Sequence, residues 1–184
     1  MRARPFALMA VCALMGVSAF TMGATAAQMV PTMVVSGKGL VNLSLGASQS
    51  NSVALLKSWL GPASTPLTST PDLRLCGVGD TAAWGPVGAY FNHQRLVGLS
   101  FGPGRSLHVR TTAGLRRGDT LARARALYGQ ELMTSRAQGG AWFVTTSPHR
   151  IDGFLNPSSA KAPSSSAKIW TIDVGVVGCP AESP

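Results

Sequence analysis

The chain repeats itself, and this internal similarity constrains the fold more than any single motif. Leu45–Ser48 corresponds to Arg117–Thr120, and each stretch leads into a helical segment that ends at a glycine, residues 53–61 in the first copy and 121–129 in the second. Residues 49–52 form an insertion in the first copy. The similarity indicates that one structural unit is used twice.

The second copy shows why these segments are expected to be helices. Asp119 or Thr120 can accept hydrogen bonds from the first free backbone N–H groups, and Gly129 can take the left-handed conformation that ends a helix. Apolar residues recur at helical spacing between Leu121 and Tyr128, so one face should lie on a core. Segments this short need tertiary packing to be stable.

Strands are expected to follow each helix in the same order. Three corresponding pairs are predicted, 84–91 with 140–146, 95–101 with 150–156, and 106–111 with 168–174. The last pair alternates β-branched and polar residues, as in a sheet with one solvated face. The Pro/Ser-rich segments 61–71 and 156–167 are expected to be solvated loops. The predicted fold class is α+β, with two tandem units of a helix and a three-stranded antiparallel sheet; whether the two sheets merge into one curved sheet stays open.

The first 27 residues are typical of a secretory signal, because two arginines precede an apolar run from Phe6 to Phe20 and small residues follow it. An uncleaved anchor helix is the alternative, since Phe6 to Ala27 is almost long enough to span a bilayer. We expect cleavage, because no charged stop-transfer flank follows, and no stable membrane span afterwards. The predicted organisation is a signal peptide at 1–27, a first unit at 28–111 and a second at 112–184, in a secreted or envelope-associated protein.

Two cysteines remain after removal of the signal, Cys76 and Cys179. In an oxidising compartment an even pair is expected to form a disulfide. A bridge that closes so long a loop can contribute about 4–5 kcal/mol to stability. Metal ligation is the alternative, but two isolated cysteines without a neighbouring histidine match no zinc spacing. No metal or other cofactor is expected.

A Gly118–Thr120 lead and a helix that closes on Leu127–Gly129, in a unit given twice with three strands each, resemble a known family. The pattern resembles the tandem repeat of the beta-lactamase inhibitor protein family, and is similar to the single unit of the outer-membrane assembly lipoprotein BamE. Its Arg/Ala/Gly-rich composition resembles secreted proteins of high-GC Gram-positive bacteria. The resemblance implies a curved sheet that presents strands and hairpin tips for binding, without catalytic machinery. The inhibitor's repeats resemble units with their own disulfides, whereas here a bridge would join the two copies.

One segment matches an enzyme motif. Gly98–Gly102 has the G-x-S-x-G pattern with Ser100 as nucleophile, and Asp119 and His149 follow in the chain order of a hydrolase triad. A nucleophile elbow needs a strand that turns sharply into a helix, but Pro103 follows almost at once. We therefore expect no enzymatic activity, and a small serine hydrolase is the weak alternative.

The charge is basic and is supplied mainly by arginine. Lys and Arg total 16 against 7 for Asp and Glu, which gives a net charge of +9. Five arginines surround the second helix: Arg116, Arg117, Arg123, Arg125 and Arg136. They could form a positive face that attracts anionic cell-wall polymer, or an ordinary solvated surface. Nucleic acid is not expected, because the chain is exported and lacks alternating aromatic and basic residues.

A protein-binding site is predicted at two hairpin turns and one strand. The turns span Phe91–Arg95 and Thr146–Arg150, and a tryptophan on an alternating strand can point outward as interface anchors do. The predicted partner-binding residues are His93, Arg95, His149, Arg150 and Trp170; solvated turn histidines are the alternative. The sequence thus predicts a secreted, non-enzymatic module for a protein partner, and the resemblance implies an envelope enzyme such as a beta-lactamase. The alternative is an envelope-associated structural protein that binds anionic cell-wall polymer through its arginines.

Overall fold

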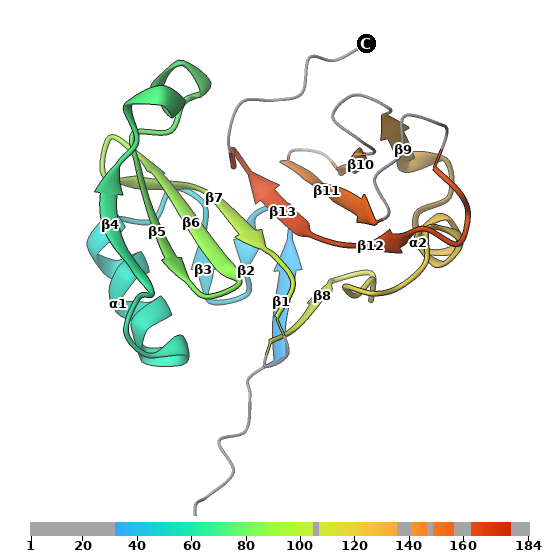
Figure 1. The fold of residues 1–184 in the computed structure, drawn as a ribbon, viewed down its shortest axis with the longest axis horizontal. Coiled ribbons are helices and arrows are strands. Elements are labelled where there is room, and N and C mark those ends of the chain that lie inside the picture. Colours follow the sequence, from blue (N-terminus) through green and yellow to red (C-terminus); the bar gives the residue numbers. More distant parts are fainter. Residues whose placement is uncertain (1–31, 105–106, 136–140, 147–148, 157–162, 178–184) are drawn as a thin grey trace, which may run out of the picture.

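Two β-sheets make up most of the fold. The computed structural model describes residues 32–104, 107–135, 141–146, 149–156 and 163–177, so the predicted signal peptide lies outside the described residues. A nine-stranded antiparallel sheet takes strands from both halves of the chain, and a four-stranded mixed sheet lies beside it (Figure 1).

The nine-stranded sheet brings the two halves together through a late strand. Its order is β4 (Thr65–Ser69), β5 (Asp80–Trp84), β6 (Val87–Asn92), β7 (Arg95–Phe101), β13 (Ile172–Gly175), β11 (His149–Asn156), β10 (Ala141–Thr146) and β9 (Leu132–Ser135), with β12 (Lys168–Ile169) paired to β11 off this path. Strand β13 therefore lies between β7 from the first half and β11 from the second.

The four-stranded sheet combines the first described segment with one from the middle of the chain. Its order is β3 (Leu43–Ser44), β2 (Gly39–Leu40), β1 (Thr32–Ser36) and β8 (His108–Thr111). Strands β1 and β8 are parallel, with Thr32 opposite His108 and Val35 opposite Thr111.

Two α-helices, α1 (Gln49–Leu60) and α2 (Leu121–Tyr128), begin where the sequence provides a cap. The Ser48 hydroxyl accepts a hydrogen bond from Asn51 N at 3.3 Å, and the Thr120 hydroxyl accepts one from Arg123 N at 3.1 Å. Residues 49–52 form the first turn of α1 and are not an insertion outside the helix. Short 3₁₀ segments are η1 (Pro71–Cys76) and η2 (Gly129–Glu131).

One hydrophobic core joins both halves. Its buried members come from both sheets and both helices, and include Val35, Leu56, Leu99, Leu121, Trp142 and Val174. Both helices thus cover the same face of the nine-stranded sheet, and we name the opposite face the outer face. Within the described ranges, no helix combines the length and apolar character needed to cross a bilayer.

The predicted fold class, α+β with two tandem helix-plus-three-stranded units, is wrong. The fold is mainly β, and the predicted equivalent strands lie in different sheets: β8 pairs in parallel with β1, whereas β13 is central in the nine-stranded sheet. The physical reason is β1, to which the sequence analysis assigned no strand. Its Met33 and Val35 are buried, and their burial together with Val109 holds β8 in the smaller sheet.

The predicted loops are also partly wrong. Residues 61–71 contain β4, which pairs with β5 although all five of its residues are exposed. Of residues 156–167, the described end is tied to a helix start, because Leu121 N donates to Ala167 O at 2.8 Å and Ala122 N donates to Ser165 O at 2.9 Å. These carbonyls satisfy N–H groups that the first turn of α2 leaves free.

Candidate functional site

A β-bulge on the outer face exposes two aromatic side chains. Trp170 N and Thr171 N both donate to Phe154 O, at 2.8 and 3.4 Å, the two-against-one pairing of a bulge. The flanking Ile169 and Ile172 are both buried, so the extra residue lets Trp170 and Thr171 both avoid the core. Trp170 is 44% exposed and Phe154 is 40% exposed. We name Trp170 and Phe154 the aromatic pair.

A hydrogen-bonded polar network lies next to the aromatic pair. Ser100, Asp173 and Asp152 occupy directly opposed positions on β7, β13 and β11. Asp173 Oδ1 accepts from Ser100 Oγ at 2.5 Å, and its Oδ2 accepts from Thr171 Oγ1 at 3.0 Å. Thr171 Oγ1 also accepts from Phe154 N at 2.9 Å. The bulge hydroxyl therefore links the aromatic pair to the carboxylate.

Burial dominates the electrostatics of this network. It raises the pKa of the Asp173 carboxyl from 3.8 to about 6, with a smaller rise from the charge of Asp152, while hydrogen bonds from Ser100 and Thr171 lower it. Burial also raises the pKa of Asp152 to about 6, although the nearby Arg150 guanidinium lowers it. The Asp152 and Asp173 carboxylates, on adjacent strands, are thus both poorly solvated.

Two further side chains complete the network. Arg150 Nε lies 2.8 Å from Asp152 Oδ2 and partly neutralises it. Tyr90 is on β6, half-buried, two residues from the Gly88 that faces Ser100 across the strands. Burial raises the pKa of the Tyr90 phenol, the Asp173 charge adds to the rise, and a hydrogen bond with Ser100 opposes it.

The structure brings the two predicted turns to the same end of the sheet. Strands β7 and β11 start from these turns and are both antiparallel to β13, so both begin at the same end. His93 and Arg95 are exposed there, and Arg95 donates to Gly46 O at 3.1 Å. His149 pairs with Thr146, but the loop between them lies outside the described residues. Arg150 belongs to the polar network.

Trp170 lies away from these turns. It precedes β13, whose far end at Gly175 is level with the turns; five strand residues span about 16 Å. The five predicted residues therefore share a sheet but do not form one cluster. Sequence reasoning missed Asp152, Asp173, Thr171 and Phe154, although the alternation along β11 and β13 was a usable signal for the two carboxylates.

The β6–β7 turn has an unusual backbone. It is a two-residue turn in which His93 and Gln94 have φ of 46° and 59°, without glycine or asparagine. Left-handed conformations cost ordinary residues about 1–2 kcal/mol each. Gln94 O accepts from Gln49 N at 2.8 Å, which ties the turn to the start of α1.

The hydrolase motif has a different environment from the one an elbow requires. Ser100 lies inside β7, and its hydroxyl donates to Asp173. The Asp119 carboxylate accepts from Arg116 N at 2.9 Å in the loop before α2. The side chain of His149, the third residue of the predicted triad, lies outside the described part of the structure.

The predicted disulfide involves Cys179, which lies outside the described residues, so the pairing stays a prediction. The described contacts nearest to Cys76 involve the last described strand end. Val176 N donates to Val97 O at 2.8 Å, and a Cβ built on Gly77 would lie 4.0 Å from Val176 Cγ1. Gly77, which follows Cys76, thus lies beside Val176, which precedes Cys179 by three residues. Three residues of extended chain span about 10 Å.

Neither a cluster of metal ligands nor similarity to a known protein assigns a function to this site. Among the described residues, no group of three or more His, Cys, Asp or Glu side chains is arranged to hold a metal ion. No family model, no curated protein and no solved structure matches this chain.

Proposed function

We propose that this protein is a non-enzymatic binding module that holds a protein partner on the outer face of its nine-stranded sheet. The observation that supports the proposal is the aromatic pair, half-exposed beside the partly buried Ser100–Asp173–Thr171 network. Aromatic side chains next to preorganised polar groups are typical of the residues that dominate protein interfaces.

The face is already ordered for binding. Trp170 and Phe154 stand on a bulge whose backbone is fixed by hydrogen bonds to the Phe154 carbonyl and to Thr171 Oγ1. Immobilising flexible side chains on association costs about 0.5–1.5 kcal/mol each. Side chains held by a sheet avoid part of this cost, which favours a binding role for the aromatic pair.

Charge indicates the chemistry of the partner. The chain is basic, with a net charge of +9, yet two of its 7 acidic residues, Asp152 and Asp173, lie together on this face. Asp173 is buried and hydrogen-bonded, whereas the Asp152 side chain is 21% exposed. A partner that offers a cationic or hydrogen-bond-donating group to Asp152, beside an apolar patch, would complement the face. The family resemblance suggests a beta-lactamase or another envelope enzyme, acting outside the cytoplasm as the predicted signal implies.

The test is direct binding to purified beta-lactamases, with inhibition of hydrolysis as a second readout. Trp170→Ala and Phe154→Ala should each weaken binding at least tenfold, as expected for interface anchors. Val41→Ala is the matched control, since Val41 is 71% exposed on the turn between β2 and β3 of the smaller sheet.

The outcomes separate the proposal from its alternatives. Binding that survives moderate salt and is lost only in the two aromatic variants supports an apolar interface. Equal binding by all three variants would overturn the proposed face. Association that disappears with salt in every variant would instead indicate an ionic surface, because exposed charges are screened.

A further inference from the structure

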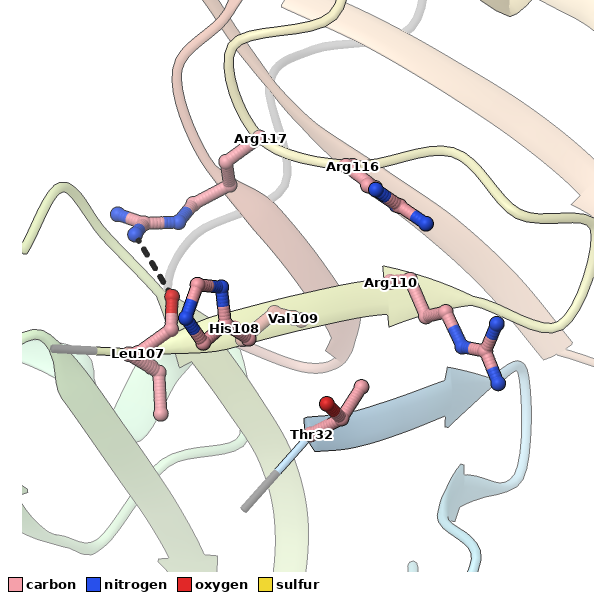
Figure 2. Close-up of a pocket in the computed structure, with 7 residues that line it drawn as sticks. All are labelled: Thr32, Leu107, His108, Val109, Arg110, Arg116 and Arg117. Carbon is pink, nitrogen blue, oxygen red and sulfur yellow. Dashed lines mark hydrogen bonds between the residues drawn. The ribbon is translucent and has the colours of Figure 1, made fainter. Parts of the chain in front are cut away.

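A cationic pocket lies on the smaller sheet, away from the outer face. It has a volume of about 370 Å³ and is formed by β1, β8 and the loop before α2 (Figure 2). Its lining residues include three arginines and a histidine: Arg110, Arg116, Arg117 and His108, with Thr32. The sequence places Arg116 and Arg117 near the second helix, but nothing in it indicates that they lie beside β8.

Two of these arginines are directly opposed. Arg110 and Arg116 form an isolated antiparallel bridge, so their side chains leave the backbone on the same side, about 5 Å apart at Cα. Both are exposed. Like charges at directly opposed positions destabilise a sheet. An anion bound between the two guanidinium groups would relieve this repulsion.

No acidic side chain neutralises this pair within the described residues. The ion pair that the described residues form joins Arg150 to Asp152, and it lies on the nine-stranded sheet. Asp119 is nearby, but its carboxylate accepts a hydrogen bond from the backbone N of Arg116 at 2.9 Å. The N–H donors of the Arg110 and Arg116 guanidinium groups are therefore available to a ligand.

Arg117 has a different role. Its guanidinium donates to the carbonyl groups of Gly102 and Gly104. It also donates to the carbonyl of Leu107 at 3.3 Å, the hydrogen bond that is dashed in Figure 2. Burial lowers the pKa of this guanidinium from its usual value. Arg117 therefore fixes the backbone around Leu107, which lines one wall of the pocket. Because its donors are used in these contacts, Arg117 is a positioning residue and does not bind the ligand.

We infer that this pocket binds a phosphoester group between Arg110 and Arg116. Two guanidinium groups supply forked donors that match phosphate oxygens. His108 stands two residues before Arg110 on β8, and Thr32 lies opposite it on β1, so an imidazole and a hydroxyl flank the charged pair. The volume is typical of sites for small organic ligands, which suggests a phosphate attached to a larger group.

The experiment measures binding of three probes by calorimetry on the secreted protein: inorganic phosphate, glycerol 3-phosphate and poly(glycerol phosphate). The test variant is Arg110→Gln/Arg116→Gln. The control is Arg123→Gln/Arg125→Gln, which removes the same charge from exposed positions of α2. The pocket variant should lose at least tenfold in affinity and the control less than threefold.

The three probes distinguish the source of the phosphate. Tight binding of glycerol 3-phosphate supports a small phosphoester ligand, and binding of the polymer alone supports a phosphate-containing polymer. Saturable binding of no probe, or equal loss in both variants, would overturn the inference.

A second readout does not need a ligand. In phosphate-free, low-salt buffer, Arg110→Gln should raise Tm by about 1–2 °C, because it removes a like-charge repulsion. The same variant should lose the Tm rise that the best probe produces in the wild type. A lower Tm in the variant would show that Arg110 is satisfied within the protein and would count against the inference.

Discussion

The Ser100 hydroxyl donates to the Asp173 carboxylate across two adjacent strands at 2.5 Å. This contact joins the first half of the chain to its late strand β13. It is partly buried on the outer face, and Asp173 itself is only 3% exposed. A charge so poorly solvated is stable only while its hydrogen bonds persist. The network should therefore respond strongly to pH and to the loss of one donor.

Stability should rise as the pH falls from 7 to 5. The pKa values of Asp152 and Asp173 are raised to about 6 in the folded protein, so the folded state binds more protons than the unfolded chain between about pH 4 and pH 6. The gain should be about 1–2 kcal/mol for the two coupled groups. Urea denaturation at a series of pH values measures it, and Asp173→Asn should remove about half. A stability that instead rises from pH 5 to 7 would contradict the assigned burial.

Ser100→Ala should destabilise the protein by about 1–3 kcal/mol, because it leaves one oxygen of a buried carboxylate without its donor. The double variant Ser100→Ala/Asp173→Asn should lose less than the two single variants together. Denaturant unfolding of all four proteins completes the cycle, and simple additivity would show that the two groups do not interact.

The same serine should not react with a fluorophosphonate probe. Its hydroxyl is bound to a carboxylate inside a strand, without the sharp turn that exposes a hydrolase nucleophile. Intact mass spectrometry after incubation with the probe checks this. An adduct on Ser100 would revive the serine hydrolase alternative.

Gly153→Ala should be among the most damaging single changes near the candidate site. A Cβ at this position would lie 2.2 Å from Thr171 O and 2.9 Å from Trp142 Nε1, so the bulge would have to move. We expect a loss of about 3 kcal/mol or more, with weaker partner binding. Gly102→Ala is the control, because its nearest contact would be an ordinary 3.6 Å. Comparable Tm values for the two variants would contradict the described packing.

Gln94→Gly should stabilise the protein by about 0.5–1 kcal/mol. Glycine relieves the left-handed backbone at φ 59°, and this gain exceeds the entropy that it adds to the unfolded chain. Gly129→Ala is the converse control: φ is 57°, no atom lies within 4 Å of the added Cβ, and a loss of about 1 kcal/mol is expected. Thermal unfolding of both variants tests whether Tm rises in the first and falls in the second.

Intact mass with and without reductant, after thiol alkylation, tests the Cys76–Cys179 bridge and the predicted cleavage near residue 27 together. An oxidised protein that resists alkylation until reduced is expected. Alkylation of both thiols before reduction would exclude the bridge.

Local features of the fold were readable from the sequence, whereas pairings between distant segments were not. Thr120 and Gly129 delimit α2 because a side-chain acceptor and a flexible residue act within one helical turn. The partner of β8 depends on β1, more than 70 residues earlier, whose five residues give only a weak alternating pattern. The repeat interpretation failed on this non-local pairing.

The candidate site shows the same division. The sequence predicts that Trp170 points outward from a strand at 168–174; it is exposed, but it lies between β12 and β13 at the bulge. Trp142 is fully buried, as expected for a core tryptophan. The bulge at Thr171 was not foreseeable, because the pairing of two residues with Phe154 is decided by the register of another strand. Asp173 was expected on a solvated face, and neighbouring strands bury it.

The central place of β13 also determines how the molecule can be assembled. Before residues 172–175 leave the ribosome, β7 and β11 each lack a neighbour on one side and expose unpaired backbone groups. Those residues close the gap between strands made much earlier. A truncated fragment ending ahead of residue 172 should consequently aggregate readily and be recognised by chaperones, because β7 and most of β11 would be exposed edges in addition to the outer edges β4 and β9 of the complete sheet.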